Sequence, residues 1–134
     1  MKKLGFGLMR MPTIDKTNAA DVDIEQVKKM VDLFMEKGFT YFDTAIMYNG
    51  FASQSTAKAA LVDRYPRDSF TLATKLHAAF FDSTEEREKV FNEQLEQTGA
   101  GYFDYYLLHG IEAVINDIWR HIWNIAFCPT VGRK

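Results

Sequence analysis

Three short runs of apolar and β-favouring residues in this chain each lead directly into one polar side chain. The runs span 39–42, 70–74 and 105–108, and the polar residues that follow them are Asp43, Lys75 and His109. These polar residues lie 32 and 34 positions apart, which is enough for one strand, one helix and two loops per unit. The spacing therefore predicts an α/β protein built from repeated βα units.

The order of these elements also predicts where the polar residues lie in space. Strands that are apolar on both faces are typical of parallel sheets covered by helices. In βα barrels, the residues at the carboxyl ends of the strands are the ones that meet a substrate. We therefore expect Asp43, Lys75 and His109 to share one rim of the sheet, with Tyr48 on the loop just beyond Asp43.

Helical repeats of apolar residues fill the gaps between the strands. Asp23 is an N-cap candidate for the first repeat, and Gly38 is its expected stop. Ser83 begins a sequence with capping-box spacing, which predicts the start of another helix. The expected elements are a strand over 4–9 and helices that begin near 24, 55 and 83 and stop near 38, 63 and 99.

The length of the chain limits how much of a barrel it can form. A complete TIM (β/α)8 barrel usually takes about 250 residues, and this chain has 134. The predicted fold class is therefore the N-terminal half of a TIM barrel, with about four βα units in residues 1–110. Residues 111–134 are expected to form an amphipathic helix and tail. This helix either packs on the outer face of the last strand or presents an apolar stripe to a partner subunit.

Composition and charge exclude several classes of protein. Hydrophobic residues make up 47% of the chain and charged residues 25%, and the formal net charge is −2, as in an ordinary globular protein. This balance predicts no nucleic-acid partner. No apolar stretch is long enough to span a bilayer, and no signal-peptide core follows Met1, so we expect a cytoplasmic protein without a membrane partner. The lone Cys128 cannot hold an iron–sulfur cluster, which needs four ligands.

Four segments taken together resemble one enzyme family. The segments are 4–12, 42–45 with Tyr48 five positions after Asp43, 72–75 and 105–109. In this order they are similar to the aldo-keto reductases, and the resemblance covers roughly residues 3–110. Details at 65–68 and 94–99 are most similar to bacterial members with a C-terminal ferredoxin-like extension, for which these 134 residues contain no counterpart.

The resemblance implies an oxidoreductase that uses NADPH or NADH, and no metal, to reduce a small aldehyde or ketone. It makes Asp43, Tyr48, Lys75 and His109 the expected catalytic tetrad. Tyr48 is the expected acid that protonates the carbonyl oxygen. The Lys75 ammonium favours the phenolate, and Asp43 keeps that ammonium charged and aimed. His109 is expected to donate a hydrogen bond to the carbonyl oxygen and to orient the substrate.

The cofactor contacts that the resemblance implies within this chain are Met9, Arg10 and Asp43. The family binds most of the dinucleotide through later strands and loops, which have no counterpart in this sequence. A second departure is Gln54, which stands where relatives usually carry an acidic residue. Both departures bear on activity more than on fold.

Each candidate residue also has an ordinary structural interpretation when it is taken alone. Asp43 suits a turn cap, Lys75 a solvated charge, His109 a core or turn histidine, and Tyr48 a packing residue. The chain as a whole has two alternatives to a reductase. One is a noncatalytic half-barrel fragment or self-association module, which would form a homo-oligomer through the open barrel edges. The other is a lyase that uses Lys75 as a Schiff-base nucleophile. His77 and His121 match no motif and are expected to be surface or packing residues.

Overall fold

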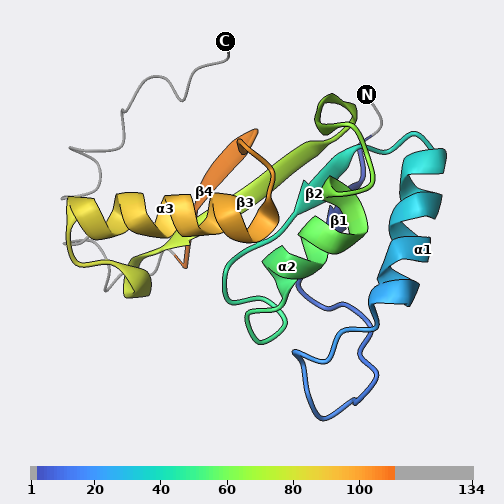
Figure 1. The fold of residues 1–134 in the computed structure, drawn as a ribbon, viewed down its shortest axis with the longest axis horizontal. Helices are drawn as coiled ribbons and strands as arrows, with labels where there is room; N and C mark the ends of the chain where they lie inside the picture. The colour runs from blue at the N-terminus through green and yellow to red at the C-terminus, as the bar shows by residue number, and fades with distance from the viewer. Residues whose placement is uncertain (1–2, 111–134) are drawn as a thin grey trace.

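The computed structural model describes residues 3–110, and strands and helices alternate along them (Figure 1). The strands are β1 (Gly5–Gly7), β2 (Tyr41–Asp43), β3 (Thr71–His77) and β4 (Tyr105–His109). The helices are α1 (Ile24–Glu36), α2 (Ser53–Ala57) and α3 (Thr84–Thr98), with short helical turns η1 (Lys58–Val62), η2 (Arg67–Ser69) and η3 (Ala78–Phe80). The amphipathic helix expected within 111–134 lies outside the described residues.

The four strands form one sheet in the order β1-β2-β3-β4, and every neighbouring pair is parallel. Gly7 pairs with Asp43, and Asp43 pairs with Ala73 on its other side. Across the next pair of strands, His77 lies opposite His109. The predicted array of parallel βα units is therefore confirmed, and its strands follow chain order as they do in the wall of a barrel.

Helix α1 follows the apolar repeat that predicted it. The Asp23 carboxylate accepts a hydrogen bond from the backbone N–H of Gln26 at 3.0 Å, which caps the start of the helix. Val27 and Val31 on the inward face are fully buried in the main core. Beyond the end of α1, Gly38 takes the left-handed conformation, with φ of 76°, that commonly closes a helix.

Three elements differ from their predicted limits, since strand β3 continues past the predicted run 70–74 to His77. Helix α2 begins at Ser53, before position 55, because the buried Ser53 hydroxyl donates to the Leu8 carbonyl at 2.9 Å. The helix then widens into the π-helical turn η1, in which the Asp63 N–H donates to the Lys58 carbonyl at 2.9 Å. Strand β1 is shorter than the predicted 4–9, because the chain turns away after the Leu8 N–H has bonded to the Asp43 carbonyl.

The helices pack against one face of the sheet, and the core lies between the two layers (Figure 1). Three rings meet in this core: the Phe34 ring centroid lies 5.4 Å from that of Phe6 and 5.2 Å from that of Phe42. The opposite face, which would line a barrel interior, carries large apolar side chains. There, Tyr105 is 54% exposed and Leu107 is 40% exposed. The described residues therefore form a two-layer structure with a one-sided core.

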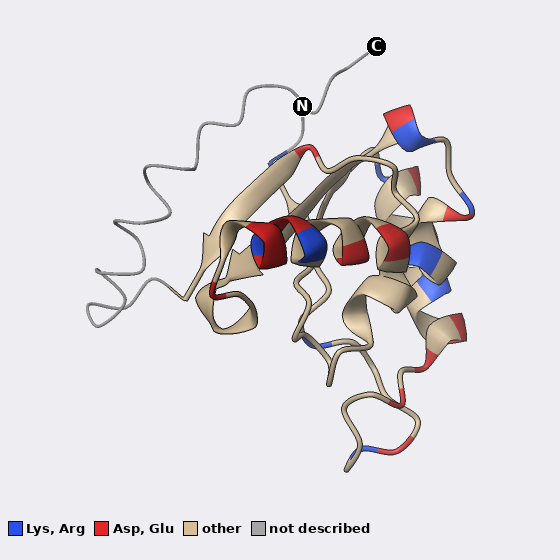
Figure 2. Ribbon diagram, turned by 60° about the vertical axis from the view of Figure 1, so that its left-hand side comes forward, with Lys and Arg blue, Asp and Glu red and all other residues tan. Residues whose placement is uncertain are grey.

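Charged residues are placed on the outside of this arrangement. Figure 2 shows acidic and basic residues along the length of α3 and at several loops, whereas most of the sheet is tan. The start of α3 is capped by Ser83, whose hydroxyl oxygen accepts from the Glu86 N–H at 3.1 Å. Within residues 3–110, no helix is both long enough and apolar enough to cross a membrane.

One ion pair connects the turn before β3 to the loop that leads into β4. The Arg67 guanidinium contacts the Asp104 carboxylate at 2.7 Å and also donates to the carbonyl oxygens of Ala100, at 3.1 Å, and Tyr102, at 2.8 Å. The same Asp104 carboxylate accepts from the Leu72 N–H at 2.8 Å. Only 19% of the Arg67 side chain and 21% of the Asp104 side chain are exposed. The Arg67 guanidinium therefore positions the start of β4.

We predict that Arg67→Met lowers the free energy of unfolding by about 2–3 kcal/mol. The change removes the ion-pair partner of Asp104 and the donor to the carbonyls of Ala100, Tyr102 and Phe70. The matched control is Arg64→Met, since Arg64 also pairs with an aspartate, Asp32, but in a more exposed setting of 31% and 45%. That change is expected to cost about 1 kcal/mol or less. Urea unfolding followed by circular dichroism measures both, and equal losses would contradict the assigned role of Arg67.

Candidate active site

The register of the sheet brings three of the predicted site residues to one edge. Asp43 is the last residue of β2 and lies opposite Ala73. Lys75 lies on β3 two positions after Ala73, and side chains two positions apart on a strand share a face. The partner of Lys75 on β4 is Leu107, two positions before His109. Asp43, Lys75 and His109 therefore lie on the face opposite the helices, at the carboxyl ends of their strands.

The Lys75 ammonium has two partners at the end of β2. It forms an ion pair with the Asp43 carboxylate, and it donates a hydrogen bond to the Thr44 carbonyl at 2.9 Å. Only 12% of the Lys75 side chain and 26% of the Asp43 side chain are exposed. A partly buried ammonium keeps its proton when it is paired and hydrogen-bonded in this way. The positive charge is therefore held at a defined point on the rim.

Tyr48 lies between this charge and His109. The Lys75 Nζ is 4.7 Å from the centroid of the Tyr48 ring, within the range of a cation–π contact. The Tyr48 and His109 rings meet edge to face, with centroids 5.5 Å apart and planes at 90°. The structure thus brings together all four residues that the sequence singled out, although their catalytic roles remain predictions.

Neighbouring charges and burial act on His109. Burial lowers the pKa of His109, the neighbouring Lys75 and His77 lower it further, and the Asp43 carboxylate partly opposes them. The His109 Nδ1 atom is buried and has no hydrogen-bond partner among the described residues. A buried N–H without an acceptor is rarer than a buried bare nitrogen, so the neutral ring is best assigned its proton on Nε2. His109 is therefore suited to act as a neutral hydrogen-bond donor.

The loop that carries Tyr48 is held in an unusual conformation. Asn49 and Phe51 both have positive φ angles, 47° and 71°, which residues other than glycine adopt infrequently. The Asn49 side chain fastens the loop: its oxygen accepts from the Met11 N–H at 3.3 Å, and its NH₂ group donates to the Ala19 carbonyl at 3.1 Å. Contacts to the β1–α1 loop therefore hold the backbone next to Tyr48.

A row of buried amides lies behind the strand that carries Lys75. Gln54, which replaces the acidic residue usual in the family, is fully buried and donates to the Thr74 hydroxyl at 3.1 Å. Gln94 of α3 is also fully buried and donates to the Lys75 carbonyl at 3.0 Å. Sequence reasoning missed the role of Gln94. The sequence signal that could have indicated this role is the position of Gln94 one helical turn after Val90, on the helix face that is buried.

The two other predicted cofactor contacts lie on the loop after β1. Met9 and Arg10 are exposed, Met9 to 52%. Their loop leaves the sheet next to Asp43, because Gly7 at the end of β1 pairs with Asp43. Both residues are therefore near the same rim, and their contact with a cofactor remains a prediction.

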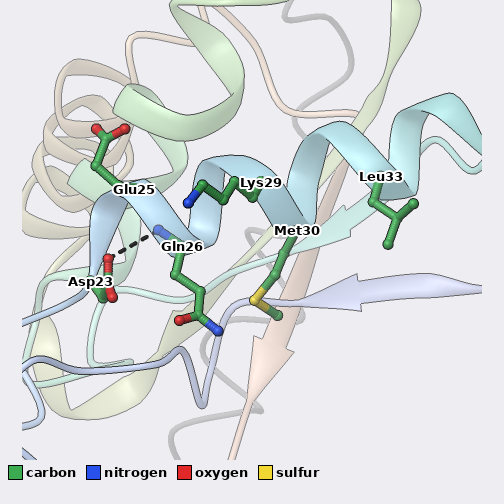
Figure 3. Close-up of a pocket in the computed structure, with 6 residues that line it drawn as sticks. All are labelled: Asp23, Glu25, Gln26, Lys29, Met30 and Leu33. Carbon is green, nitrogen blue, oxygen red and sulfur yellow. Dashed lines mark hydrogen bonds between the residues drawn. The ribbon is translucent and has the colours of Figure 1, made fainter.

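A hollow on α1 is separate from this rim. Figure 3 shows the six residues that line it: Asp23, Glu25, Gln26, Lys29, Met30 and Leu33. All six belong to α1 or to its cap, and the dashed contact from Gln26 to Asp23 is the capping hydrogen bond. The hollow is the surface of a single helix on the other side of the sheet from Lys75, and we assign it no function.

Comparison with known proteins agrees with this geometry. A family model described as "Aldo/keto reductase family" matches residues 3–125, which extends past the boundary at 110 that the motifs suggested. A protein named a probable NAD(P)H-dependent D-xylose reductase, from Aspergillus clavatus, is 30% identical over 111 residues, or 81% of this chain and 30% of that protein.

Solved structures show the same relationship. A holo aldo-keto reductase from Bacillus halodurans has a TM-score of 0.68 and 27% identity over 88% of this chain and 38% of its own. An aldo-keto reductase from Klebsiella pneumoniae, in complex with NADPH, has a TM-score of 0.63 and 21% identity over 91% of this chain and 40% of its own. The predicted fold class, part of a TIM barrel, is therefore confirmed.

This chain spans less than half the length of each of these three relatives. The family match nevertheless covers most of the chain, and it includes all four strands of the described sheet. The chain belongs to the aldo/keto reductase family.

Proposed function

We propose that this chain carries the carbonyl-reducing site of a nicotinamide-dependent aldo-keto reductase and acts on an aldehyde or ketone. The observation that carries the proposal is the contact of the paired Lys75 ammonium with Tyr48, next to the half-buried imidazole of His109. A phenol, an ammonium and a neutral imidazole together suit one task, which is to protonate an oxygen as negative charge develops on it.

The donor set itself implies a cofactor, because none of the four side chains can deliver a hydride. A reduced nicotinamide, when bound, supplies that hydride to the carbonyl carbon. The rim next to Asp43 has room for a ligand, since a Cβ placed on Gly7 would meet no atom within 4 Å. Met9, Arg10 and Asp43 are the residues that would hold part of the cofactor. The relatives named for NAD(P)H and NADPH support this cofactor class.

Tyr48 is the proposed general acid. When its hydroxyl gives up a proton to the carbonyl oxygen, the Lys75 ammonium stabilises the phenolate that remains. Asp43 and the Thr44 carbonyl hold that ammonium in place, so the charge is already positioned before reaction. His109 would donate from Nε2 to the same carbonyl oxygen and orient the substrate.

Among residues 3–110, no group of three or more His, Cys, Asp or Glu side chains is arranged to hold a metal ion. The proposed chemistry uses none. The ion pair also bears on the lyase alternative, because a Schiff base requires an uncharged amine and Asp43 favours the charged form of Lys75. A reductase is therefore the better supported of the two enzymatic functions.

A second candidate function is self-association through the open face of the sheet. Tyr105 and Leu107 are exposed on that face, and β1 and β4 each pair on one side only among the described residues. Two copies related by a twofold axis would place β4 of each beside β1 of the other and close eight parallel strands. This arrangement also covers the exposed side chains.

We predict a dimer whose fraction rises with concentration. Sedimentation velocity across a tenfold concentration range measures it, and Leu107→Lys, which introduces a charge on the open face, is expected to shift the equilibrium toward monomer. The matched control is Leu33→Lys on the exposed outer side of α1, where Leu33 is 55% exposed. A monomer at every concentration would contradict the association.

We predict that Tyr48→Phe lowers the rate of NADPH-dependent aldehyde reduction by about 10² to 10⁴-fold, because it removes the proposed acid. The fold should be unchanged, since the ring remains. Tyr41→Phe is the matched control: Tyr41 lies on the same face, with its ring 6.1 Å from that of Tyr105, and has no proposed role in proton transfer. Tyr48→Phe activity within a few-fold of the parent would refute the assignment.

We also predict that this chain alone binds NADPH more weakly than about 100 μM, because the family's later strands contribute most of the contacts. An affinity of about 1 μM needs about 8.2 kcal/mol of binding free energy, which few contacts can supply. Quenching of NADPH fluorescence measures the affinity. A low-micromolar dissociation constant for the monomer would show that the first half of the barrel is sufficient.

A further inference from the structure

His77 matched no motif in the sequence, but the structure places it beside His109. His77 is the last residue of β3 and His109 the last of β4, and the two are paired in the parallel ladder. Their ring centroids are 5.4 Å apart with planes at 85°, an edge-to-face contact. Lys75 lies two positions before His77 and shares its face of the sheet.

The His77 ring is itself held on several sides. Its Nδ1 accepts a hydrogen bond from the Ala79 N–H at 3.1 Å, and its ring contacts Phe80 at 5.8 Å between centroids. On the side of β4, Gly110 leaves the space that the ring occupies: a Cβ on Gly110 would lie 2.9 Å from the His77 Nε2. A ring fixed by a backbone donor, an aromatic neighbour and a glycine has a defined orientation toward His109.

We propose that His77 is a positioning residue that fixes the orientation of the His109 ring at the rim. The neutral form of His109, which donates from Nε2, is favoured by this arrangement. The edge-to-face contact restricts the His109 ring, whose centroid also lies 5.5 Å from that of Tyr48. His109 therefore contacts two rings at the rim. The inference rests on the proposed function, because it assumes that His109 acts as a hydrogen-bond donor to substrate.

The charges around His109 favour the same protonation state. Lys75 and His77 face it from β3, Asp43 faces it from β2, and Tyr48 contacts it from the following loop. A proton on His109 would add positive charge beside the Lys75 ammonium, and only Asp43 would compensate. Asp43 is already paired with Lys75, so the balance favours neutral imidazole.

The test is an NMR titration of the imidazole resonances in the full chain, without substrate or cofactor. In the parent protein, the His109 midpoint is expected below its ordinary value of 6.5. In His77→Gln the contacting ring is lost, and the midpoint should rise toward 6.5. In His77→Phe an aromatic ring is kept beside His109, so a smaller rise is expected. The chain has three histidines, so His121→Gln is needed beside the His77 variants to assign the His109 resonance.

A pair of glycine variants tests the geometry with His77 intact. Gly110→Ala should displace the His77 ring and raise the His109 midpoint, because its Cβ would collide with Nε2. The control is Gly101→Ala: Gly101 also has a positive φ, 73° against 69°, but a Cβ there would meet nothing within 4 Å. Both changes strain the backbone, and only Gly110→Ala should move the titration.

The proposal is overturned if the His109 midpoint is the same in the parent, His77→Gln and His77→Phe, or if the two glycine variants shift it equally. Urea unfolding of each variant separates a local effect from loss of the fold. Because the readout needs no turnover, the proposed reductase function can fail in the Tyr48→Phe experiment while the coupling of His77 to His109 still holds.

Discussion

The ion pair between Lys75 and Asp43 fixes the position of the other groups on the rim. It connects the ends of β2 and β3, and its ammonium also contacts the Thr44 carbonyl and the face of the Tyr48 ring. Placing a charge where only 12% of its side chain is exposed costs desolvation energy, and the pairing offsets that cost. Without the carboxylate, the ammonium beside the Tyr48 ring would have no opposite charge to hold it in place. The arrangement of the candidate site therefore depends on this one contact.

The helix layer supports the rim from behind with polar contacts. Gln94 reaches through the core to the Lys75 carbonyl, and Gln54 reaches the neighbouring Thr74 hydroxyl, both from fully buried positions. A shift of β3 by one residue would break both hydrogen bonds, so these amides add to the register that apolar packing specifies. The position of Lys75 is thus set from both faces of the sheet. The edge-to-face rings of Tyr48, His109 and His77 continue this restraint along the rim.

The half-barrel carries the rim residues, but one face of its sheet is left uncovered. In a parallel sheet both faces are normally covered, and here the described helices cover one. Tyr105 and Leu107 remain exposed on the other face, where a complete barrel would pack its interior. The same face carries Lys75 and His109. Closure by a second copy would therefore bury the apolar side chains and lower the solvent exposure around the candidate site at the same time.

Local patterns in the sequence determined the order of elements, the stripe of α1, the caps at Asp23 and Ser83, and the placement of Asp43 and His109 at strand ends, with Lys75 two positions before the end of β3. Those features depend on neighbours within one or two turns and on the fixed alternation of a strand. Tertiary structure decided what depends on distant partners: Ser53 joining α2 to β1, Gln94 turning toward Lys75, and His77 standing beside His109. A polar residue is buried only where another segment supplies its hydrogen-bond partner, and that partner is set by strand register and helix packing, which no local repeat contains.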